Sequence, residues 1–215
     1  MLRVQEMSAV RDIPIWGDRR RVRVGLLGGS FNPAHAGHIH VARAAMRRLG
    51  LDQIWLLVSP GNPLKPRAGM APAAHRLASA RKLADGRRII ATDIERHLGT
   101  RFTYDTLRAL RRRFPRVAFV WIMGGDNLIQ MPRWHRWAEL ARTTKIAVLP
   151  RPAYTHKALS SQAAQRFRHA RVAAQRAGAL TAMPDPAWVF LQGRQNTLSA
   201  TALRGANNPF AGDAS

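Results

Sequence analysis

An alternating and then apolar stretch that ends in two glycines places the strongest constraint on the fold. Residues 22–27 read Val-Arg-Val-Gly-Leu-Leu, as a strand entering a parallel sheet does, and Gly28 and Gly29 follow directly. The next periodic segment, 36–49, carries apolar residues at helical spacing. The chain therefore opens with a strand, a glycine turn and a helix.

Further strand-like segments recur along the chain, with helical patterns between them. The strands are expected at 54–58, 88–91, 117–122, 145–149 and 188–191, and 73–84 is expected to be a helix. Strands that alternate with helices imply right-handed crossovers and an α/β fold with a doubly wound, mostly parallel sheet. We expect a Rossmann-like topology, with a long polar helix at 160–178 on the periphery.

One domain is expected from residue 22 to residue 204. Residues 1–21 are basic, lack the apolar centre of a secretory signal, and are interpreted as a flexible or loosely packed extension. Residues 205–215 are expected to form a disordered tail. The longest apolar stretch, 117–123, has the length of a buried strand, so no membrane partner is expected. The chain contains no cysteine, which fits a reducing cytoplasm.

The charge of the chain favours anionic partners without choosing among them. It has 35 lysine and arginine residues against 12 acidic ones, a formal net charge of +23. Nucleic acid, anionic lipid and nucleotide phosphates all suit such an excess, and arginines on solvated helix faces explain it about as well. The sequence has no basic platform interleaved with aromatic residues. Nucleic acid is therefore not the expected partner, and an RNA-binding module is the less favoured hypothesis.

The candidate site follows the first strand, because ligands of an open parallel sheet bind outside the carboxyl ends of its strands. Gly28 and Gly29 let the backbone approach a ligand, and the helix behind them offers unpaired N–H groups to phosphate oxygens. His35 and His38 are three residues apart, so a helical turn that includes both puts two imidazoles on one face. Imidazoles placed there would stabilise the charge that develops in phosphoryl-type transfer.

These residues resemble the nucleotidyltransferase superfamily, whose signature is a His/Thr-x-Gly-His motif after the first strand. The string at 28–38, Gly-Gly-Ser-Phe-Asn-Pro-Ala-His-Ala-Gly-His, is similar to that of bacterial nicotinate-nucleotide adenylyltransferases, and the likeness extends from Val22 to Arg204. The resemblance implies adenylyl transfer from ATP to nicotinate mononucleotide, with Mg²⁺ carried by the ATP. Nicotinamide mononucleotide or phosphopantetheine as the acceptor is the nearest alternative.

The resemblance assigns ATP binding to several separated motifs. The residues are Gly28, Gly29, Ser30, Phe31, His35, His38, Lys65, Asp126, Ser199, Thr201 and Arg204. The candidate catalytic residues among them are His35, His38, Lys65 and Arg204. Lys65 carries a flexible point charge that is suited to binding phosphate. A solvent-exposed loop lysine without a binding role would also fit the sequence at this position. Ser199 and Thr201 belong to a Ser-x-Thr-x-x-Arg motif, which a simple capped helix would also explain.

A second set of residues is assigned to the acceptor by the same resemblance. It consists of Asn32, Thr103, Trp134 and His135. Thr103 is expected to cap a helix whose first N–H groups take the nicotinate carboxylate. Trp134 is expected to stack on the nicotinate ring. His135 stands where the family usually has an aromatic residue, and no acidic cluster has the spacing of an all-protein metal site.

Overall fold

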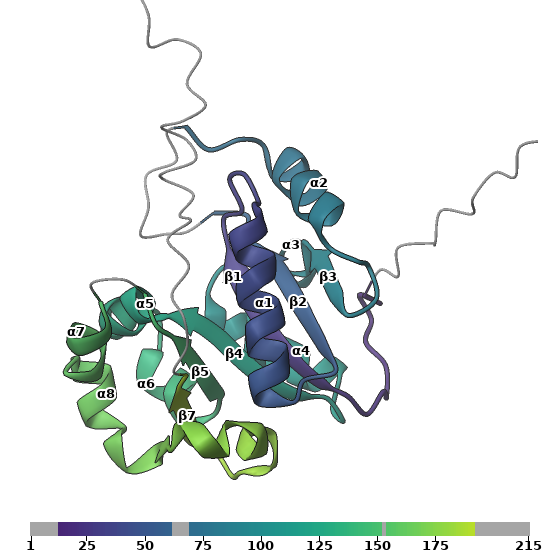
Figure 1. Ribbon diagram of the computed structural model, residues 1–215. Coiled ribbons are helices and arrows are strands. Elements are labelled where there is room, and N and C mark those ends of the chain that lie inside the picture. Colours follow the sequence, from purple (N-terminus) through teal and green to yellow (C-terminus); the bar gives the residue numbers. More distant parts are fainter. Residues whose placement is uncertain (1–12, 62–68, 152–153, 192–215) are drawn as a thin grey trace, which may run out of the picture.

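A parallel sheet of seven strands forms the centre of the computed structural model, which describes residues 13–61, 69–151 and 154–191 (Figure 1). The strands are β1 Arg23–Gly29, β2 Gln53–Val58, β3 Ile89–Thr92, β4 Ala118–Gly124, β5 Lys145–Leu149, β6 Arg171–Val172 and β7 Ala187–Phe190. All neighbouring strands in this sheet run parallel. The predicted α/β fold class with a doubly wound parallel sheet is confirmed.

The strand order, β3-β2-β1-β4-β5-β7-β6, determines where a ligand can bind. From β1 the chain winds outward to β3, and it then returns to place β4 on the other side of β1. Leu27 of β1 pairs with Leu56 of β2 and with Ile122 of β4. A crevice forms outside the carboxyl ends of the strands where the order reverses in this way. The ends of β1 and β4 therefore mark the candidate site.

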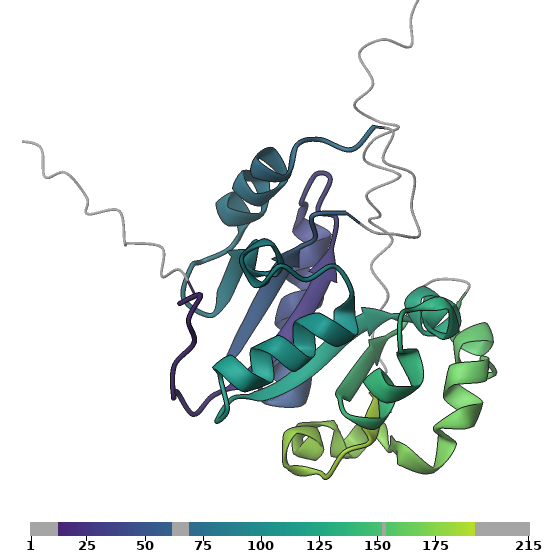
Figure 2. The same cartoon turned by 180° about the vertical axis from the view of Figure 1, so that it is seen from behind.

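Helices cover both faces of the sheet, because the central strands are apolar on both sides. One face packs against α1 Ala36–Leu49, α2 Ala73–Leu83 and the 3₁₀ helix η3 Ala174–Ala182, with α1 in front of the sheet in Figure 1. The other face packs against α3 Ile94–Leu98, α4 Thr103–Arg113, α5 Gly125–Gln130, the 3₁₀ helix η1 Met131–Arg133, α6 Trp137–Arg142, α7 Thr155–Leu159 and α8 Gln162–Arg166 (Figure 2). Among the described residues, no helix is long and apolar enough to cross a membrane.

The segment after α7 differs from its predicted form. The sequence predicted one long helix over 160–178, whereas the chain forms α8, the 3₁₀ helix η2 Arg168–Ala170, the strand β6 and then η3. Phe167 packs in the core on one face of the sheet, and Ala177 packs in the core on the other face. A straight helix cannot reach both faces, so the chain passes around the sheet edge and adds β6 there. The helix prediction was wrong for this reason.

The chain is already packed before the predicted domain start at residue 22. Ile13 is 5% exposed and belongs to the core on the α4 face. Nη1 of Arg113, at the end of α4, donates a hydrogen bond to the carbonyl oxygen of Ile15 at 2.6 Å. The domain limits at 22 and 204 stay predictions, and the expected tail at 205–215 lies outside the described residues.

The substitution Ile13→Ala tests whether this first segment contributes to the core. It is expected to lower the free energy of unfolding by about 2 kcal/mol, because buried methyl groups are lost and a cavity remains. Trp16 is 83% exposed, so Trp16→Ala should change the same quantity by less than about 0.5 kcal/mol. Urea denaturation measures both variants, and equally small effects would show that the segment adds no packing.

Candidate active site

β1 ends in two glycines because aromatic rings occupy the space beside them. A Cβ atom on Gly28 would lie 2.6 Å from Cη2 of Trp121, and one on Gly29 would lie 3.1 Å from Cε2 of Phe31. Phe31 has a φ of 48°, a left-handed conformation that is uncommon outside glycine, and its ring is buried against that of His38. The chain therefore turns back tightly between the end of β1 and the start of α1.

His35 and His38 cap α1 together. His35 is the N-cap residue, and its Nδ1 accepts a hydrogen bond from the backbone N–H of Gly37 at 3.2 Å. In return, Nδ1 of His38 accepts from the backbone N–H of His35 at 3.1 Å. The two ring centroids are 3.9 Å apart. This is a capping box in which histidines replace the usual Ser or Thr and Glu or Gln.

These hydrogen bonds determine which nitrogen of each imidazole carries the proton. An Nδ1 that accepts from a backbone N–H is unprotonated, so the neutral ring carries its hydrogen on Nε2. Burial, followed by the charges of His35 and Arg151, lowers the pKa of His38 to about 4. Burial, followed by the charge of Arg151, also lowers the pKa of His35. At pH 7 both side chains therefore offer a neutral Nε2–H donor.

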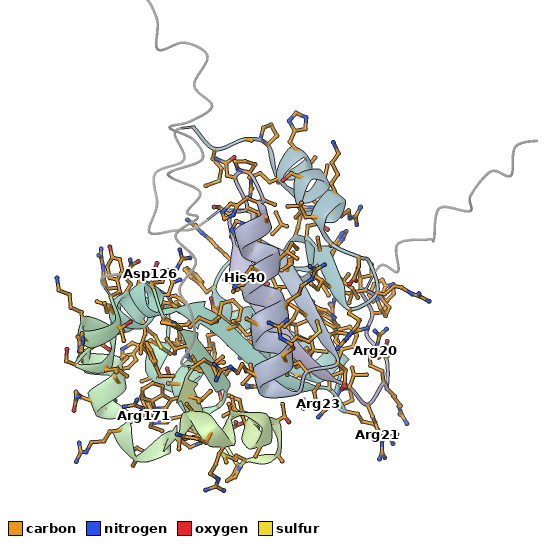
Figure 3. All side chains as sticks on the ribbon, viewed as in Figure 1. Arg20, Arg21, Arg23, His40, Asp126 and Arg171 are labelled. Carbon is orange, nitrogen blue, oxygen red and sulfur yellow. The ribbon has the colours of Figure 1, made fainter. Side chains whose placement is uncertain are left out.

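Arg151 supplies positive charge at the same end of the sheet. It follows β5 and lies close enough to His35 and His38 to disfavour their charged forms. Its Nε is 3.6 Å from Oδ1 of Asp126, an oxygen that is buried and has no hydrogen-bond partner among the described residues. Asp126 lies beyond the strand ends, at the far end of the molecule from Arg23 (Figure 3). No sequence motif marks Arg151 as a site residue.

Arg76 on α2 joins the loops that follow β1 and β2. It is 2% exposed, and its Nη1 donates to the carbonyl oxygens of Ser30 at 2.7 Å and Ser59 at 2.8 Å. Its Nε donates to the carbonyl oxygen of Ala71 at 2.9 Å. Burial lowers the pKa of Arg76, but a guanidinium remains charged. Both loops border the crevice, so this side chain sets the distance between them.

Asn32 connects the turn after β1 to the segment before α2. Its Nδ2 donates to the carbonyl oxygen of Gly69 at 2.9 Å, and its Oδ1 accepts from the backbone N–H of Ala71 at 3.1 Å. These two hydrogen bonds within the chain account for an asparagine at this position. The predicted role of Asn32 in acceptor binding stays a prediction.

A cavity of about 200 Å³ opens beside the glycine turn. Gly28, Gly29 and Ser30 border it on the side of β1, and Thr103 and Trp134 border it on the side of α4. The structure thus brings together residues that the sequence assigned separately to ATP and to the acceptor. The arrangement would allow two bound molecules to meet at the carboxyl ends of β1 and β4.

The helix N-terminus at this cavity carries no side-chain cap. Phe102 has an extended backbone and holds the N-cap position, so Thr103 is the first helical residue and its predicted capping role is wrong. The first N–H groups of α4 remain available to an anion. Trp134 stands edge-on to Trp121, with ring centroids 6.4 Å apart, and His135 stacks on Phe102 at 4.6 Å.

Four predicted phosphate ligands lie outside the described residues. They are Lys65, Ser199, Thr201 and Arg204. Their roles stay predictions. Within the described part of the chain, no group of three or more His, Asp or Glu side chains is placed to hold a metal ion.

Comparison with known proteins identifies the family. Residues 26–206 match the cytidylyltransferase-like family. A protein of Gluconobacter oxydans named "Probable nicotinate-nucleotide adenylyltransferase" is 57% identical over 85% of this chain and 94% of its own. One of the same name from Gluconacetobacter diazotrophicus is 53% identical over 89% of each chain. The chain belongs to the nicotinate-nucleotide adenylyltransferase family.

Solved adenylyltransferase structures share the fold. The nicotinic acid mononucleotide adenylyltransferase of Plasmodium falciparum, complexed with NaAD, superposes with a TM-score of 0.62 at 15% identity. The match covers 86% of this chain and 83% of the other. The same enzyme complexed with APC gives a TM-score of 0.61 at 16% identity, over the same shares of the two chains. The Rossmann-like arrangement predicted for the chain is therefore shared with these structures.

The adenylyltransferase motifs assign no role to the one acidic residue among the described residues that line the cavity. Glu95 on α3 is 7% exposed and lies in the cavity wall. Its Oε1 accepts a hydrogen bond from Oγ1 of Thr106 at 3.1 Å. Burial raises the pKa of Glu95 to about 7, and the hydrogen bond from Thr106 opposes this. A lone glutamate near the start of a short helix has no local signal that could have marked it.

Arg76→Lys tests whether the guanidinium holds the two loops. The variant should lose about 2 to 4 kcal/mol of unfolding free energy, because an ammonium cannot reach all three carbonyl oxygens and leaves buried acceptors unpaired. Arg47 is exposed on α1, so Arg47→Lys is the matched control and should change stability by less than about 0.5 kcal/mol. Urea denaturation of both gives the comparison, and equal stabilities would refute the role given to Arg76.

Proposed function

We propose that this chain transfers the adenylyl group of ATP to nicotinate mononucleotide and releases nicotinate adenine dinucleotide and pyrophosphate. The single observation that carries the proposal is the meeting of the glycine turn and the uncapped start of α4 around one cavity. The first is suited to phosphates and the second to a ring with a carboxylate. Relatives more than half identical in sequence bear the name of this activity. A cytoplasmic location is part of the proposal, as expected for a chain without cysteine.

The reaction is a direct displacement at the α-phosphorus of ATP. An oxygen of the acceptor's 5′-phosphate forms a bond to that phosphorus, and the bond to the oxygen that bridges to the β-phosphorus breaks. The electron pair leaves with pyrophosphate. The attacking phosphate is already ionised near neutral pH, so no protein base is required. Catalysis therefore consists of positioning and of stabilising negative charge.

The start of α1 supplies the donors for that charge. The tautomers of His35 and His38 leave Nε2–H free to donate to phosphate oxygens, and the α1 N-terminus adds its own partial positive charge. Arg151 adds a full charge and would exchange its contact with Asp126 for phosphate. We assign the same kind of role to Lys65 and Arg204. The hydroxyl groups of Ser199 and Thr201 would donate hydrogen bonds to the triphosphate.

Magnesium is proposed to enter with ATP. The described residues contain no cluster of three or more His, Asp or Glu side chains, and a nucleotide-held Mg²⁺ keeps its waters and needs few protein ligands. Asp126, in the first turn of α5, is a carboxylate at this end of the sheet that could contact the ion or the ribose. The ion would neutralise phosphate charge.

The acceptor is proposed to lie against α4. The first N–H groups of this helix would take the ring carboxylate at Thr103, and the indole of Trp134 would stack on the ring. A basic RNA-binding module is the alternative from another class. It has little support, because Arg20 and Arg21 lie before β1 on one side of the molecule and Arg171 lies on β6 on the other side (Figure 3). The sequence also has no basic platform interleaved with aromatic residues.

Pyrophosphate release with Mg-ATP and each acceptor tests the proposed function. Nicotinate mononucleotide, nicotinamide mononucleotide and phosphopantetheine are supplied separately, and the first should be used at least about tenfold more efficiently than the others, a difference that one well-placed charge interaction can provide. Preference for another acceptor would retain the ATP site and discard the roles of Thr103 and Trp134. Absence of release with all three would overturn the proposal.

His38→Asn tests the donor role separately from the capping role. The amide oxygen of asparagine can still accept from the N–H of His35, while the Nε2–H donor is lost. We expect kcat to fall about 10² to 10³-fold with little change in stability. His40 is exposed on the same helix, so His40→Asn controls for the helix propensity of asparagine. A His38 variant with the kcat of this control would exclude the catalytic assignment.

A further inference from the structure

Glu95 is a buried carboxyl group at the proposed acceptor position. It lines the cavity with Phe102, Thr103 and Trp134 and is 7% exposed. No Lys, Arg or His side chain of the described residues forms an ion pair with it. A buried carboxylate without a counter-ion is unfavourable in free energy, so core packing alone does not account for a glutamate in this wall.

The side chain of Glu95 is fixed by hydroxyl groups at the start of α4. Oγ1 of Thr106, which is fully buried, donates to Oε1 of Glu95 at 3.1 Å. The Thr106 hydroxyl also lies 2.9 Å from that of Thr100. The backbone N–H of Thr100 donates in turn to the carbonyl oxygen of Glu95 at 3.0 Å. These contacts hold the carboxyl group beside the helix turn that begins at Thr103.

We propose that Glu95 is a specificity-determining residue whose ionisation opposes an acceptor with a ring carboxylate and not one with a ring carboxamide. The inference rests on the proposed function, because it requires the pyridine ring to lie at this wall. Two carboxylates in one site repel each other, and strongly where one is buried as Glu95 is, and protonation of one removes the repulsion. A neutral carboxamide creates no such conflict.

Glu95 changes its charge within the range in which the enzyme would work. Burial raises its pKa to about 7, so it is mainly neutral at pH 6 and mainly ionised at pH 8.5. The apparent KM for nicotinate mononucleotide should therefore rise with pH above 7. The 5′-phosphate of the acceptor also titrates, but both acceptors carry it, so the ratio of their KM values isolates the ring.

Other charged groups surround Glu95 and must be separated from it. Arg101 precedes α4, Arg133 belongs to η1, and His135 follows η1, and all three line the cavity. His135 lies 4.0 Å from Asp105 of α4. On α3 itself, Arg96 and His97 pair with Asp93. His135→Gln removes the imidazole that lines this wall, so it belongs in the experiment as a test of a contribution from that side chain.

The test is the ratio of KM values for nicotinate and nicotinamide mononucleotide between pH 6 and pH 8.5. In the wild-type protein the ratio should rise by about tenfold or more, since each pH unit above the pKa changes the protonated fraction about tenfold. Glu95→Gln is neutral throughout, so its ratio should stay constant. At pH 8.5 this variant should bind nicotinate mononucleotide about tenfold more tightly than the wild type, a gain that a purely structural role would not produce.

Two controls make the outcomes distinct. Glu139→Gln changes a glutamate on α6 that pairs with Arg136, and it should keep the wild-type pH profile. His135 belongs to the predicted acceptor set, so His135→Gln is compared only in how its KM ratio changes with pH, and this change should follow the wild type. A wild-type ratio that does not change with pH would overturn the inference without need of any variant. A Glu95→Gln profile that follows the wild type would also overturn it. Absence of turnover with both acceptors would instead overturn the proposed function on which it rests.

Discussion

One buried guanidinium holds the part of the fold on which the candidate site depends. The loops after β1 and β2 carry carbonyl groups that the sheet ladder does not pair, and Arg76 donates to those of Ser30 and Ser59. Because it reaches them from α2, the spacing of the two loops depends on the packing of that helix. An unpaired buried carbonyl is costly, so the loops, the helix and the sheet form one cooperative unit.

The sequence predicts well those features that arise from local patterns. Alternation and helical spacing gave the strands and the first helix, and the glycine pair after β1 marked the turn. Arg76 and Arg151 were not predicted, because their importance comes from partners far away in the chain. Glu95 was not predicted, because its burial and its place in the cavity wall come from tertiary packing. The capping role of Thr103 failed since the extended backbone of Phe102 moves the helix start by one position. The prediction of one long helix over the segment that contains β6 was wrong, because its apolar residues pack in two different cores.

The start of α1 uses the same two side chains for structure and for chemistry. Each histidine accepts a backbone hydrogen bond on Nδ1, and each keeps its opposite nitrogen as a donor. The capping contact thus fixes the tautomer that phosphate binding requires, while burial keeps the rings neutral. Positive charge is provided by Arg151 instead, whose ion pair with Asp126 holds it near the crevice.

The edges of the sheet have a consequence for behaviour in concentrated solution. β3 ends the sheet on one side with four residues, and β6 ends it on the other with two. Arg171 lies on β6, and its guanidinium covers the ring of Trp188. Short edge strands, one of which carries an arginine, offer little unpaired backbone to a strand from another molecule. A chain with long, buried parallel strands at its centre is in this way protected against edge-to-edge aggregation.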